Sequence, residues 1–402
     1  HTISLCDWSS DVCSSDLHTT VNPHGTFRLH LIPSGIFYPE VSCIIGNGVV
    51  VNPAVLMREI SELSEHGVET SNLLVSDRAH LIMPYHTLLD RLEEERRGSG
   101  AIGTTQRGIG PAFVDKVART GIRVGDLQDS TVFRARLELV MEQKNALLTS
   151  LYGHPALSVD EVYEQYLGFA NQMNPYIVDT LPVIHQAMQR DDRIMLEGAQ
   201  GALLDTDFGT YPFVTSSSPL AGSATLGSGI GPTHIRRVIG VFKAYATRVG
   251  SGPMPTELKD EMGDFIREKA KEYGATTGRP RRCGWFDAIA GKFSVRINGM
   301  TEIALTHLDI FDGFESIKIC TGYRIEGRFT TDFPTQIGRV ERCEPVYEEI
   351  PGWHECTEGI SNYTQLPVNA RKYIDTISSL LDCRVSLVSM GPKREQMIEV
   401  QP

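Results

Sequence analysis

The sequence predicts an α/β fold, a single large domain whose central, mostly parallel sheet is flanked by helices. Short apolar runs of strand length alternate along the chain with longer segments of helical periodicity. Polar, glycine-bearing loops follow several of these runs, and ligands of parallel α/β sheets gather beyond the carboxyl ends of the strands. No internal repeat or low-complexity linker interrupts the pattern. We therefore expect one continuous α/β unit with elaborations.

Composition excludes several classes of protein. The chain has 402 residues, 41% of them hydrophobic and 22% charged, so it can bury a substantial core. Its net charge of -12 argues against a general binder of nucleic acids or anionic membranes, because such surfaces need a basic excess. Eight cysteines occur without a CxxC pair, which favours reduced thiols over disulfides or a zinc site. No apolar run reaches membrane-spanning length, so the expected location is the cytoplasm.

The first residues look foreign to the rest of the chain. Residues 1–17 show neither helical nor strand periodicity, and the stretch DVCSSDL at 11–17 resembles a translated sequencing-adaptor oligonucleotide. We expect residues 1–17 to be extraneous and residues 18–402 to form the domain.

The remaining elements follow from periodicity and from helix-boundary signals. Asn52 and Pro53 read as the N-cap and first position of a helix, and the charged run Glu93 to Arg97 reads as the solvated end of another. The expected strands are 28–32, 43–51, 73–75, a buried one at 193–196, 302–309, 317–323 and 384–392. The expected helices are 53–65, 85–97, 131–152, 159–190 and 233–245.

The loop after the strand at 193–196 is the first candidate binding segment. Gln200 carries an amide that both donates and accepts, Asp205 and Asp207 are acceptors, and residues 215–218 present four consecutive hydroxyls. The alternative is a surface loop in which these residue types only make turns.

The glycine-rich segment GAIGTTQRGIG at 100–110 is the second candidate. Its glycines let backbone N–H groups approach an anion closely, and Thr104 and Thr105 add hydroxyl donors. It is not a Walker A sequence, because no GK[ST] ends it. Phosphate binding and a flexible connector both remain possible.

The segment GATTGRPRRCGWFD at 274–287 carries the sharpest chemical signal. Arg279, Arg281 and Arg282 lie within four residues inside an acidic protein. Guanidinium groups bind carboxylates and phosphates through two hydrogen bonds, so the segment favours a multiply anionic small ligand. The alternative is a solvated basic turn paired to acidic neighbours.

Asp309 follows the strand expected at 302–309. Its carboxylate can accept two hydrogen bonds from a base edge such as N1 and N2 of guanine, although a lone Asp in this place is more often an N-cap. His307 is more often a packing residue than a catalyst.

With these segments in order, the chain resembles the adenylosuccinate synthetases from His18 almost to its end. The matching motifs are LHLIPSG at 29–35, IGNGVV at 45–50, IGTTQRGIGPAF at 102–113, EGAQGALLD at 197–205, GTYPFVTSS at 209–217, GATTGRPRR at 274–282 and PGW at 351–353. The resemblance implies a P-loop-NTPase-like fold and a GTP-dependent ligase that joins IMP to L-aspartate. It also implies a homodimer and a requirement for Mg2+.

Residue roles carry over by motif. His18 matches a catalytic acid at the developing oxyanion, and Gln200 matches the amide that holds the purine edge. The implied IMP ligands are Thr105, Gln200, Thr215, Arg279 and, contributed to the other subunit, Arg119. The implied aspartate ligands are Ala275, Thr276, Thr277, Gly278, Arg279 and Arg281. The implied GTP ligands are Arg281, His307, Leu308, Asp309, Ser389, Met390 and Gly391.

Two departures from the family pattern stand out. The family's phosphate loop of the GDEGKGK type, which supplies a general base and a magnesium ligand, has no counterpart before His18. We therefore expect a fold without its first strand and loop, and no metal ligands in this chain. His307 stands where the family has lysine, and a histidine can still stack on a base.

Two other functions compete with an active ligase. One is a non-catalytic binding or interaction protein that kept the IMP and aspartate pockets. Calorimetry with IMP alone tests it, because a folded ligase fragment should bind IMP weakly, whereas a protein repurposed for partners should ignore IMP. The other is a GTP hydrolase, which the arginine-rich segment opposes because simple hydrolysis needs no carboxylate receptor.

We predict no detectable ligase turnover from a chain of this sequence, because the base, magnesium ligand and phosphate loop of the family are absent from it. The measurement is adenylosuccinate formation from GTP, IMP and L-aspartate, and a measurable rate would contradict the prediction.

Overall fold

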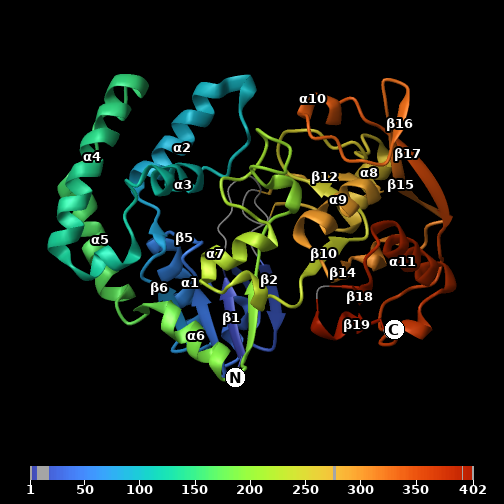
Figure 1. Cartoon of the computed structure of the whole chain (residues 1–402), viewed down its shortest axis with the longest axis horizontal. Coiled ribbons are helices and arrows are strands. Elements are labelled where there is room, and N and C mark those ends of the chain that lie inside the picture. Colours follow the sequence, from blue (N-terminus) through green and yellow to red (C-terminus); the bar gives the residue numbers. More distant parts are fainter. Residues whose placement is uncertain (1, 7–17, 275–277, 392, 401–402) are drawn as a thin grey trace. The chain divides into compact units, whose positions relative to one another are not determined.

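The computed structural model describes residues 2–6, 18–274, 278–391 and 393–400. It divides the chain into two compact units. Unit 1 comprises His1–Thr206 and Val214–His234, and unit 2 comprises Asp207–Phe213 and Ile235–Pro402. Both units combine strands with helices, which confirms the α/β class (Figure 1). No helix among the described residues is long and apolar enough to cross a membrane.

Unit 1 is built on a parallel sheet of five strands. Its order is β8 (Ile177–Val178), β6 (Leu73–Ser76), β4 (Val41–Ile45), β1 (Thr2–Cys6) and β9 (Arg193–Glu197). All four pairings are parallel, so the carboxyl ends of the strands meet at one edge of the sheet.

The expectation that the fold lacks a first strand is wrong. Thr2–Cys6 forms β1, which pairs with β4 on one side and with β9 on the other. A gap between β4 and β9 would leave a row of backbone N–H and C=O groups without partners, and β1 supplies those partners. The expectation failed because it rested on the missing glycine loop and not on the pairing needs of the sheet.

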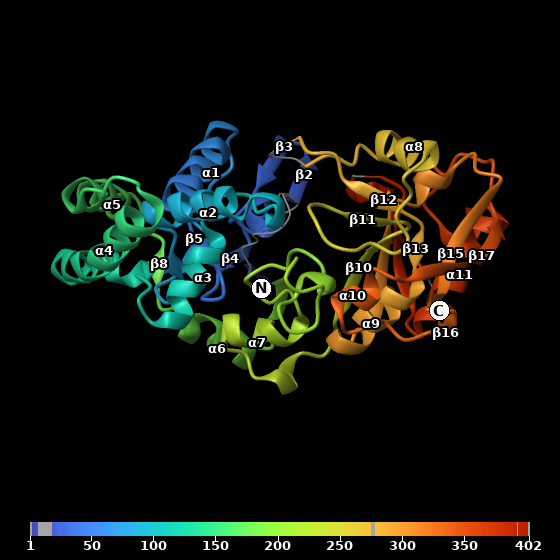
Figure 2. The same ribbon diagram turned by 90° about the horizontal axis from the view of Figure 1, so that it is seen from above.

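Helices cover both faces of this sheet (Figure 2). On one face, α1 (Pro53–Glu65) packs its Leu56 and Leu63 into the core that contains Cys43 and Ile45 of β4. On the other face, α6 (Thr180–Gln189) packs against Ile44. The alternation along β4 follows from the two-residue repeat of a strand.

Other elements of unit 1 extend this core. Asn52 caps α1 as expected, since its side chain accepts a hydrogen bond from Val55 N at 3.2 Å. The mostly helical character expected for 159–190 is confirmed, and the short strand β8 separates its two helices, α5 and α6. The remaining elements are the hairpin β2 (His18–Asn22) and β3 (Gly25–Leu29), the pair β5 (Val50–Val51) and β7 (His80–Leu81), and the helices α2 (Pro84–Arg97), α3 (Ile109–Ala118), α4 (Ser130–Tyr152), α5 (Val159–Met173) and α7 (Ala224–Ser228).

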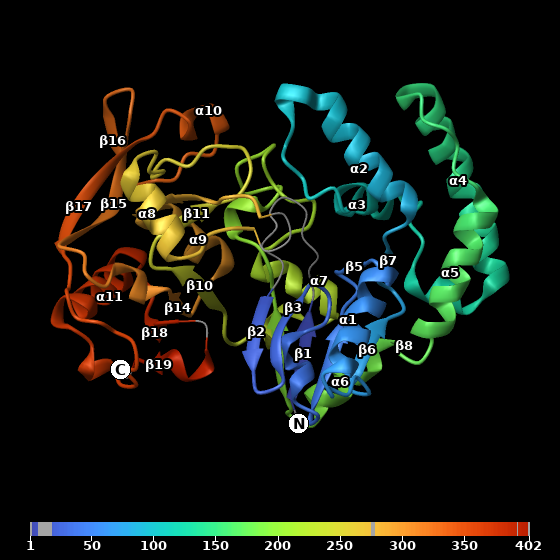
Figure 3. The same cartoon turned by 180° about the vertical axis from the view of Figure 1, so that it is seen from behind.

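Unit 2 contains a second mostly parallel sheet (Figure 3). Its order is β10 (Ile239–Lys243), β14 (Glu302–Thr306), β18 (Val385–Ser389) and the antiparallel edge strand β19 (Met397–Glu399). The helix expected at 233–245 is wrong, because the alternating residues of IGVFK pair with β14 as a strand. The other elements are β11 (Ala246–Arg248), β12 (Arg282–Gly284), β13 (Phe286–Asp287), β15 (Ser316–Ile325), β16 (Arg328–Thr330) and β17 (Glu344–Pro351), with helices α8 (Glu261–Lys269), α9 (Ala288–Asn298), α10 (Ile337–Val340) and α11 (Val368–Leu381).

Phe311 is central to the aromatic core of unit 2. Its side chain is 0% exposed, and it lies at the end of the short 3-10 helix Leu308–Phe311 that follows β14. Its ring contacts those of Tyr245, Trp285, Phe314, Trp353 and Tyr373 at centroid distances of 5.2 to 6.4 Å. This packing fixes the segment that carries His307 and Asp309.

We predict that Phe311→Ala lowers the free energy of unfolding of unit 2 by about 3–5 kcal/mol, because it removes a buried aromatic side chain and leaves a cavity. Tryptophan fluorescence during urea denaturation measures this, since two of the three tryptophans, Trp285 and Trp353, contact Phe311. Phe329→Ala is the control, because Phe329 is 58% exposed. Equal effects of the two changes would contradict the prediction.

Candidate active site

The carboxyl ends of three neighbouring strands bring polar side chains together in unit 2. Lys243 ends β10 and Tyr245 follows it, Thr306 ends β14 before His307, and Ser389 ends β18. Because β10, β14 and β18 are parallel neighbours, these side chains lie along one edge of the sheet. The structure thus brings the predicted GTP ligands that follow β14 and β18 to one edge of this sheet.

Asp309 has an unsatisfied carboxylate oxygen. Its Oδ1 is buried and has no hydrogen-bond partner among the described residues. Burial raises the pKa of Asp309 to about 6. The alternative role as an N-cap is wrong, because His307 occupies the N-cap position of the short helix and Asp309 lies inside it. An acceptor in this state suits a ligand that donates hydrogen bonds.

His307 lies beside this carboxylate on a strained backbone. Its φ of 60° is in the left-handed region, which non-glycine residues adopt uncommonly. Its ring meets the ring of Tyr245 edge to face at 6.0 Å. Burial lowers the pKa of His307, and the nearby cations Lys243 and Arg281 add to this effect. The side chain is therefore a neutral imidazole at neutral pH.

The segment after β18 is held by hydrogen bonds among its own residues. Ser389 Oγ donates to Gly391 O at 2.7 Å, and Met390 N donates to Gln396 O at 3.0 Å. These bonds fix the predicted Ser389 to Gly391 segment beside Leu308 and its neighbours, at the same sheet edge.

We call residues 272–282 the arginine loop. Its three arginines have different surroundings. Arg281 NH1 donates to Glu272 at 2.6 Å, and Arg282 binds Glu257 through two hydrogen bonds of 2.6 and 2.7 Å. The alternative of a basic turn paired to acidic neighbours therefore holds for Arg282. Arg279 is exposed, and Gly278 has a φ of 65° that glycine tolerates. The predicted ligands Ala275, Thr276 and Thr277 lie outside the described residues.

Arg281 differs from Arg282 in one respect. Its Nε is buried and has no hydrogen-bond partner among the described residues. A buried guanidinium donor without a partner is costly, so this atom is suited to an anionic ligand.

In unit 1, the loop after β9 forms a closed hydrogen-bond cluster. Gln200 Nε2 donates to Thr215 Oγ1 at 3.0 Å, Ser217 Oγ donates to Gln200 Oε1 at 3.3 Å, and the two hydroxyls are 3.0 Å apart. Gln200 has a φ of 65°, a strained conformation that the cluster maintains. Sequence analysis correctly grouped Gln200 with Thr215.

The strand that leads to this cluster is less buried than expected. The expectation of a buried strand at 193–196 is wrong, since Met195 of β9 is 50% exposed. The reason is that β9 is the edge strand of its sheet. Ser34 nevertheless anchors its end, because Ser34 Oγ donates to Glu197 at 3.0 Å.

The glycine-rich segment binds an anion that the chain itself supplies. Glu94 accepts hydrogen bonds from the backbone N–H groups of Ile102, Gly103 and Thr104 at 3.1, 2.7 and 3.1 Å. Asp90, one helical turn earlier, accepts from Thr104 Oγ1 at 2.8 Å and from Gly108 N at 2.9 Å. The expectation that these amides receive phosphate is wrong for the three that Glu94 occupies.

This arrangement also corrects the reading of the helix end. Glu94 was expected on a solvated charged face, but it is 8% exposed and Asp90 is 3% exposed. Burial raises the pKa of Asp90, and the neighbouring Glu94 carboxylate contributes to the rise. Thr105 Oγ1, in the loop that these carboxylates hold, is buried without a partner among the described residues. That hydroxyl is free to bind a ligand.

A third buried carboxylate, Glu59, supports Arg107 of the same loop through His30. Glu59, 2% exposed, lies 3.0 Å from His30 Nδ1, and Arg107 lies 2.6 Å from His30 Nε2. Arg107 can only donate, so Nε2 accepts and Nδ1 carries the proton that binds Glu59. Sequence analysis missed His30, Glu59 and Arg107.

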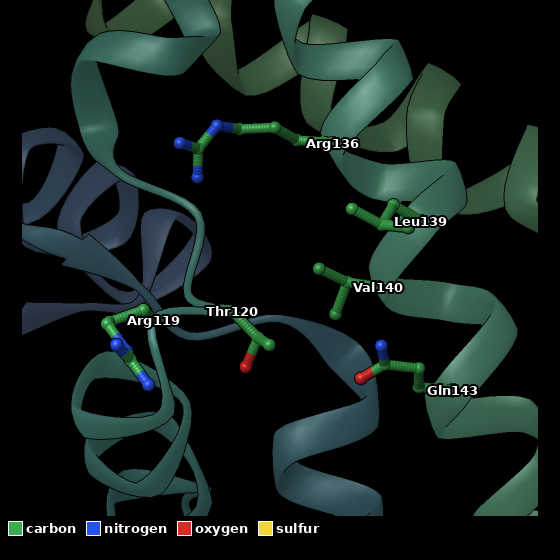
Figure 4. A pocket seen from close by; sticks show the side chains of 6 residues that line it. All are labelled: Arg119, Thr120, Arg136, Leu139, Val140 and Gln143. Carbon is green, nitrogen blue, oxygen red and sulfur yellow. The ribbon is translucent and has the colours of Figure 1, made fainter.

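Arg119 lies apart from these clusters. It is the C-cap of α3 with a φ of 65°, and it lines a hollow of about 220 Å3 with Thr120 and four residues of α4, Arg136, Leu139, Val140 and Gln143 (Figure 4). A buried bond from His86 Nε2 to Asp115 at 2.9 Å and the ion pair of Asp115 with Lys144 fasten α2, α3 and α4 together. Arg119 is thus an exposed cation on a rigid helix end.

His18 begins β2 and pairs with Leu29 of β3. Among the described residues, no group of three or more His, Cys, Asp or Glu side chains could hold a metal ion.

The three buried carboxylates Asp90, Glu94 and Glu59 share a signal that is present in the sequence. Asp90 and Glu94 are four residues apart in α2, and Glu59 lies on the apolar side of α1 with Leu56 and Leu63. A carboxylate on a buried helix face must be paired or hydrogen-bonded, so its position alone indicates a partner loop.

Comparisons with known proteins identify the family. A model of the adenylosuccinate synthetase family matches residues 16–398. The adenylosuccinate synthetase of Dehalococcoides mccartyi is 56% identical over 381 residues, which are 95% of this chain and 90% of that protein. The adenylosuccinate synthetase of Pelotomaculum thermopropionicum is 52% identical over 381 residues, with 95% and 89% covered.

Solved structures give the same result. The structure of fully ligated adenylosuccinate synthetase from Plasmodium falciparum superposes with a TM-score of 0.92 at 33% identity, covering 100% of this chain and 94% of that chain. The succinoaminodeoxyadenylate synthetase of cyanophage S-2L, with a TM-score of 0.58 at 20% identity, shares the fold. On the family match and these identities, the chain belongs to the adenylosuccinate synthetase family.

Proposed function

We propose that the sites of this chain serve the reaction that joins IMP to L-aspartate with consumption of GTP, with adenylosuccinate, GDP and phosphate as products. Family membership supports this reaction. The observation that carries it is a set of unsatisfied buried atoms, Thr105 Oγ1, Arg281 Nε and Asp309 Oδ1, on three residues that the sequence assigns to the three ligands. Buried polar groups normally have partners, so these atoms favour polar ligands.

The reaction proceeds in two transfers. The γ-phosphoryl group of GTP passes to the 6-oxygen of IMP and releases GDP. The amine of aspartate then attacks C6, and phosphate leaves with the former 6-oxygen. Phosphorylation is needed because that oxygen is otherwise a poor leaving group, and donors around it stabilise the charge that develops.

In unit 1, we assign IMP to the Gln200 cluster and the glycine-rich segment. Gln200 holds the purine edge, Thr215 and Thr105 donate hydroxyls to the 5′-phosphate, and His18 acts as the acid at the 6-oxygen. The cluster supports this role, because an amide and two hydroxyls already lie within 3.3 Å of one another. Preorganised donors of this kind lose no energy to rearrangement during the reaction.

In unit 2, we assign GTP and aspartate to the sheet edge and the arginine loop. Asp309 accepts from N1 and N2 of guanine, His307 and Leu308 line the base, and Ser389 to Gly391 lie on its other side. Arg279, Arg281 and Gly278, with Ala275 to Thr277, receive aspartate. The unsatisfied Asp309 Oδ1 and Arg281 Nε support both assignments.

Three further properties belong to this proposal. The protein acts in the cytoplasm, it works as a homodimer in which Arg119 reaches the IMP site of the partner, and it uses Mg2+ with GTP. The exposed position of Arg119 beside a hollow is compatible with the second property. When bound, Mg2+ would neutralise phosphate charge, and we assign it no ligand among the described residues.

Calorimetric titration with IMP, with GTP, and with L-aspartate in the presence of IMP tests the proposal. Saturable binding of all three supports it, and failure of the protein to bind GTP and IMP would overturn it. Adenylosuccinate formation from GTP, IMP and L-aspartate separately tests whether this chain turns over the ligands that it binds.

We predict that Asp309→Asn weakens GTP binding about 10- to 100-fold, because an amide replaces a charged double acceptor. Guanine needs the ionised carboxylate, and the pKa of Asp309 is about 6 in the free protein. GTP affinity should therefore fall about tenfold from pH 7 to pH 5, as the ionised fraction falls.

Isothermal titration of GTP across this pH range measures the effect. The Asp309→Asn protein should lack the tenfold fall, and Asp332→Asn, a change at an exposed position, should keep it. A pH dependence that survives in Asp309→Asn would show that another group causes it.

We predict that Arg279→Leu abolishes measurable binding of L-aspartate, because the Arg279 guanidinium binds a carboxylate of this ligand. GTP affinity should stay within about threefold of its original value, because GTP does not need this guanidinium. Titrations of both ligands measure the two affinities. Arg328→Leu, which removes an equally exposed arginine on β16, should change neither. Equal loss of both ligands in Arg279→Leu would show that the arginine loop is wrongly assigned.

A further inference from the structure

We propose that Glu272 is a positioning residue shared by the aspartate and GTP sites. It holds the arginine loop and the end of β10 in one arrangement, so that Arg281 and the Tyr245–His307 pair face their ligands correctly. This inference rests on the proposed function and adds a residue to it that touches neither ligand.

Both oxygens of the Glu272 carboxylate are occupied by donors from different segments. The side chain is 1% exposed. One oxygen accepts from Tyr245 OH at 2.5 Å and from Lys243 Nζ, and the other accepts from Arg281 NH1 at 2.6 Å. Tyr245 and Lys243 come from the end of β10, whereas Arg281 comes from the far end of the arginine loop. A single carboxylate therefore ties two chain segments together.

Glu272 also closes the base of the arginine loop through its backbone. Arg281 N donates to Glu272 O at 2.9 Å, and Tyr273 forms an isolated antiparallel bridge with Pro280. The two ends of the loop are thus joined twice by the same pair of residues, once by main chain and once by side chain. Glu272 and Arg281 are therefore held together at the base of the loop.

The bond to Glu272 fixes the direction of the Arg281 guanidinium. A guanidinium is a rigid planar fork, so fixing NH1 on the carboxylate also orients Nε and NH2. Nε is the buried atom without a partner among the described residues. Glu272 therefore determines the direction in which the Arg281 guanidinium can bind an anion.

The same carboxylate acts on the guanine side through Tyr245. The ring of Tyr245, whose hydroxyl binds Glu272, packs edge to face against His307, which immediately precedes Leu308 and Asp309. Lys243 Nζ lies 5.7 Å from the centre of the Tyr245 ring. A shift of Tyr245 would displace His307 from the base.

Charge balance shows what Glu272 prevents. Lys243 and Arg281 bring two cations to one buried place, and Glu272 is the carboxylate that binds both. Burial lowers the pKa of Lys243, and Glu272 opposes that change. Without the carboxylate, two like charges in a poorly solvated site would repel each other and separate.

Glu272→Gln distinguishes positioning from simple electrostatics. A nearby negative charge disfavours anionic ligands, so pure charge removal would tighten the binding of GTP and aspartate. Loss of positioning predicts the opposite, a weakening of both by about tenfold or more, as for loss of a hydrogen bond to a charged group. The affinity for IMP, assigned to unit 1, should change less than threefold.

Glu257→Gln is the matched control. Glu257 also pairs with an arginine of this loop, since it binds Arg282 through bonds of 2.6 and 2.7 Å. The control removes the same charge nearby and should leave both affinities unchanged. Tyr245→Phe, which removes one hydroxyl and is expected to fold, should weaken GTP binding roughly 3- to 10-fold.

Calorimetry with the intact protein separates the outcomes, because unfolding lowers the number of sites whereas positioning changes the dissociation constant. Unchanged or tighter binding of both ligands by Glu272→Gln, or equal weakening by Glu257→Gln, would overturn the inference. If Glu272→Gln does not fold, unchanged GTP affinity in Tyr245→Phe overturns it. If the unaltered protein binds neither ligand, the proposed function itself fails.

Discussion

The ionised carboxylate of Glu272, buried among donors from two segments, is the contact on which the ligand-facing edge of unit 2 depends. Burial alone would favour the neutral acid, yet Lys243, Tyr245 and Arg281 hold the pKa of Glu272 below its usual value. The energy of desolvating one charge is offset by the ion pairs and hydrogen bonds that surround it. Hydrogen bonds and ion pairs to one buried carboxylate therefore join the arginine loop to the end of β10.

Unit 1 uses the same physical solution for a different loop. Glu94 accepts hydrogen bonds from three consecutive backbone N–H groups of the glycine-rich segment. Glu59 supports Arg107 of that segment through His30. In each case a carboxylate on a helix, or at the end of a loop, restricts a loop that could otherwise adopt several conformations. The groups left over, such as Thr105 Oγ1, are the ones that point to ligands.

Sequence reasoning recovered the α/β class and most element positions, and it placed Gln200 and Thr215 in one candidate loop, because periodicity and long motifs are local signals. It missed β1 because strand pairing depends on residues far along the chain. It assigned 233–245 to a helix because a short apolar run fits both periods. It placed Glu94 on a solvated face because charge suggests solvent, and only the folded loop shows the amides that this carboxylate accepts.

The occupation of the glycine-rich amides by Glu94 has a consequence for the thermodynamics of ligand capture. Ordering a backbone costs roughly 1–2 kcal/mol of conformational entropy per residue, and here that loss occurs while the chain folds. A nucleotide bound at this segment, as proposed, would meet a backbone that is already ordered, and more of its contact energy would be retained as affinity. The Glu94 carboxylate orders this segment before any ligand binds, whereas many phosphate-binding loops become ordered only when their ligand binds.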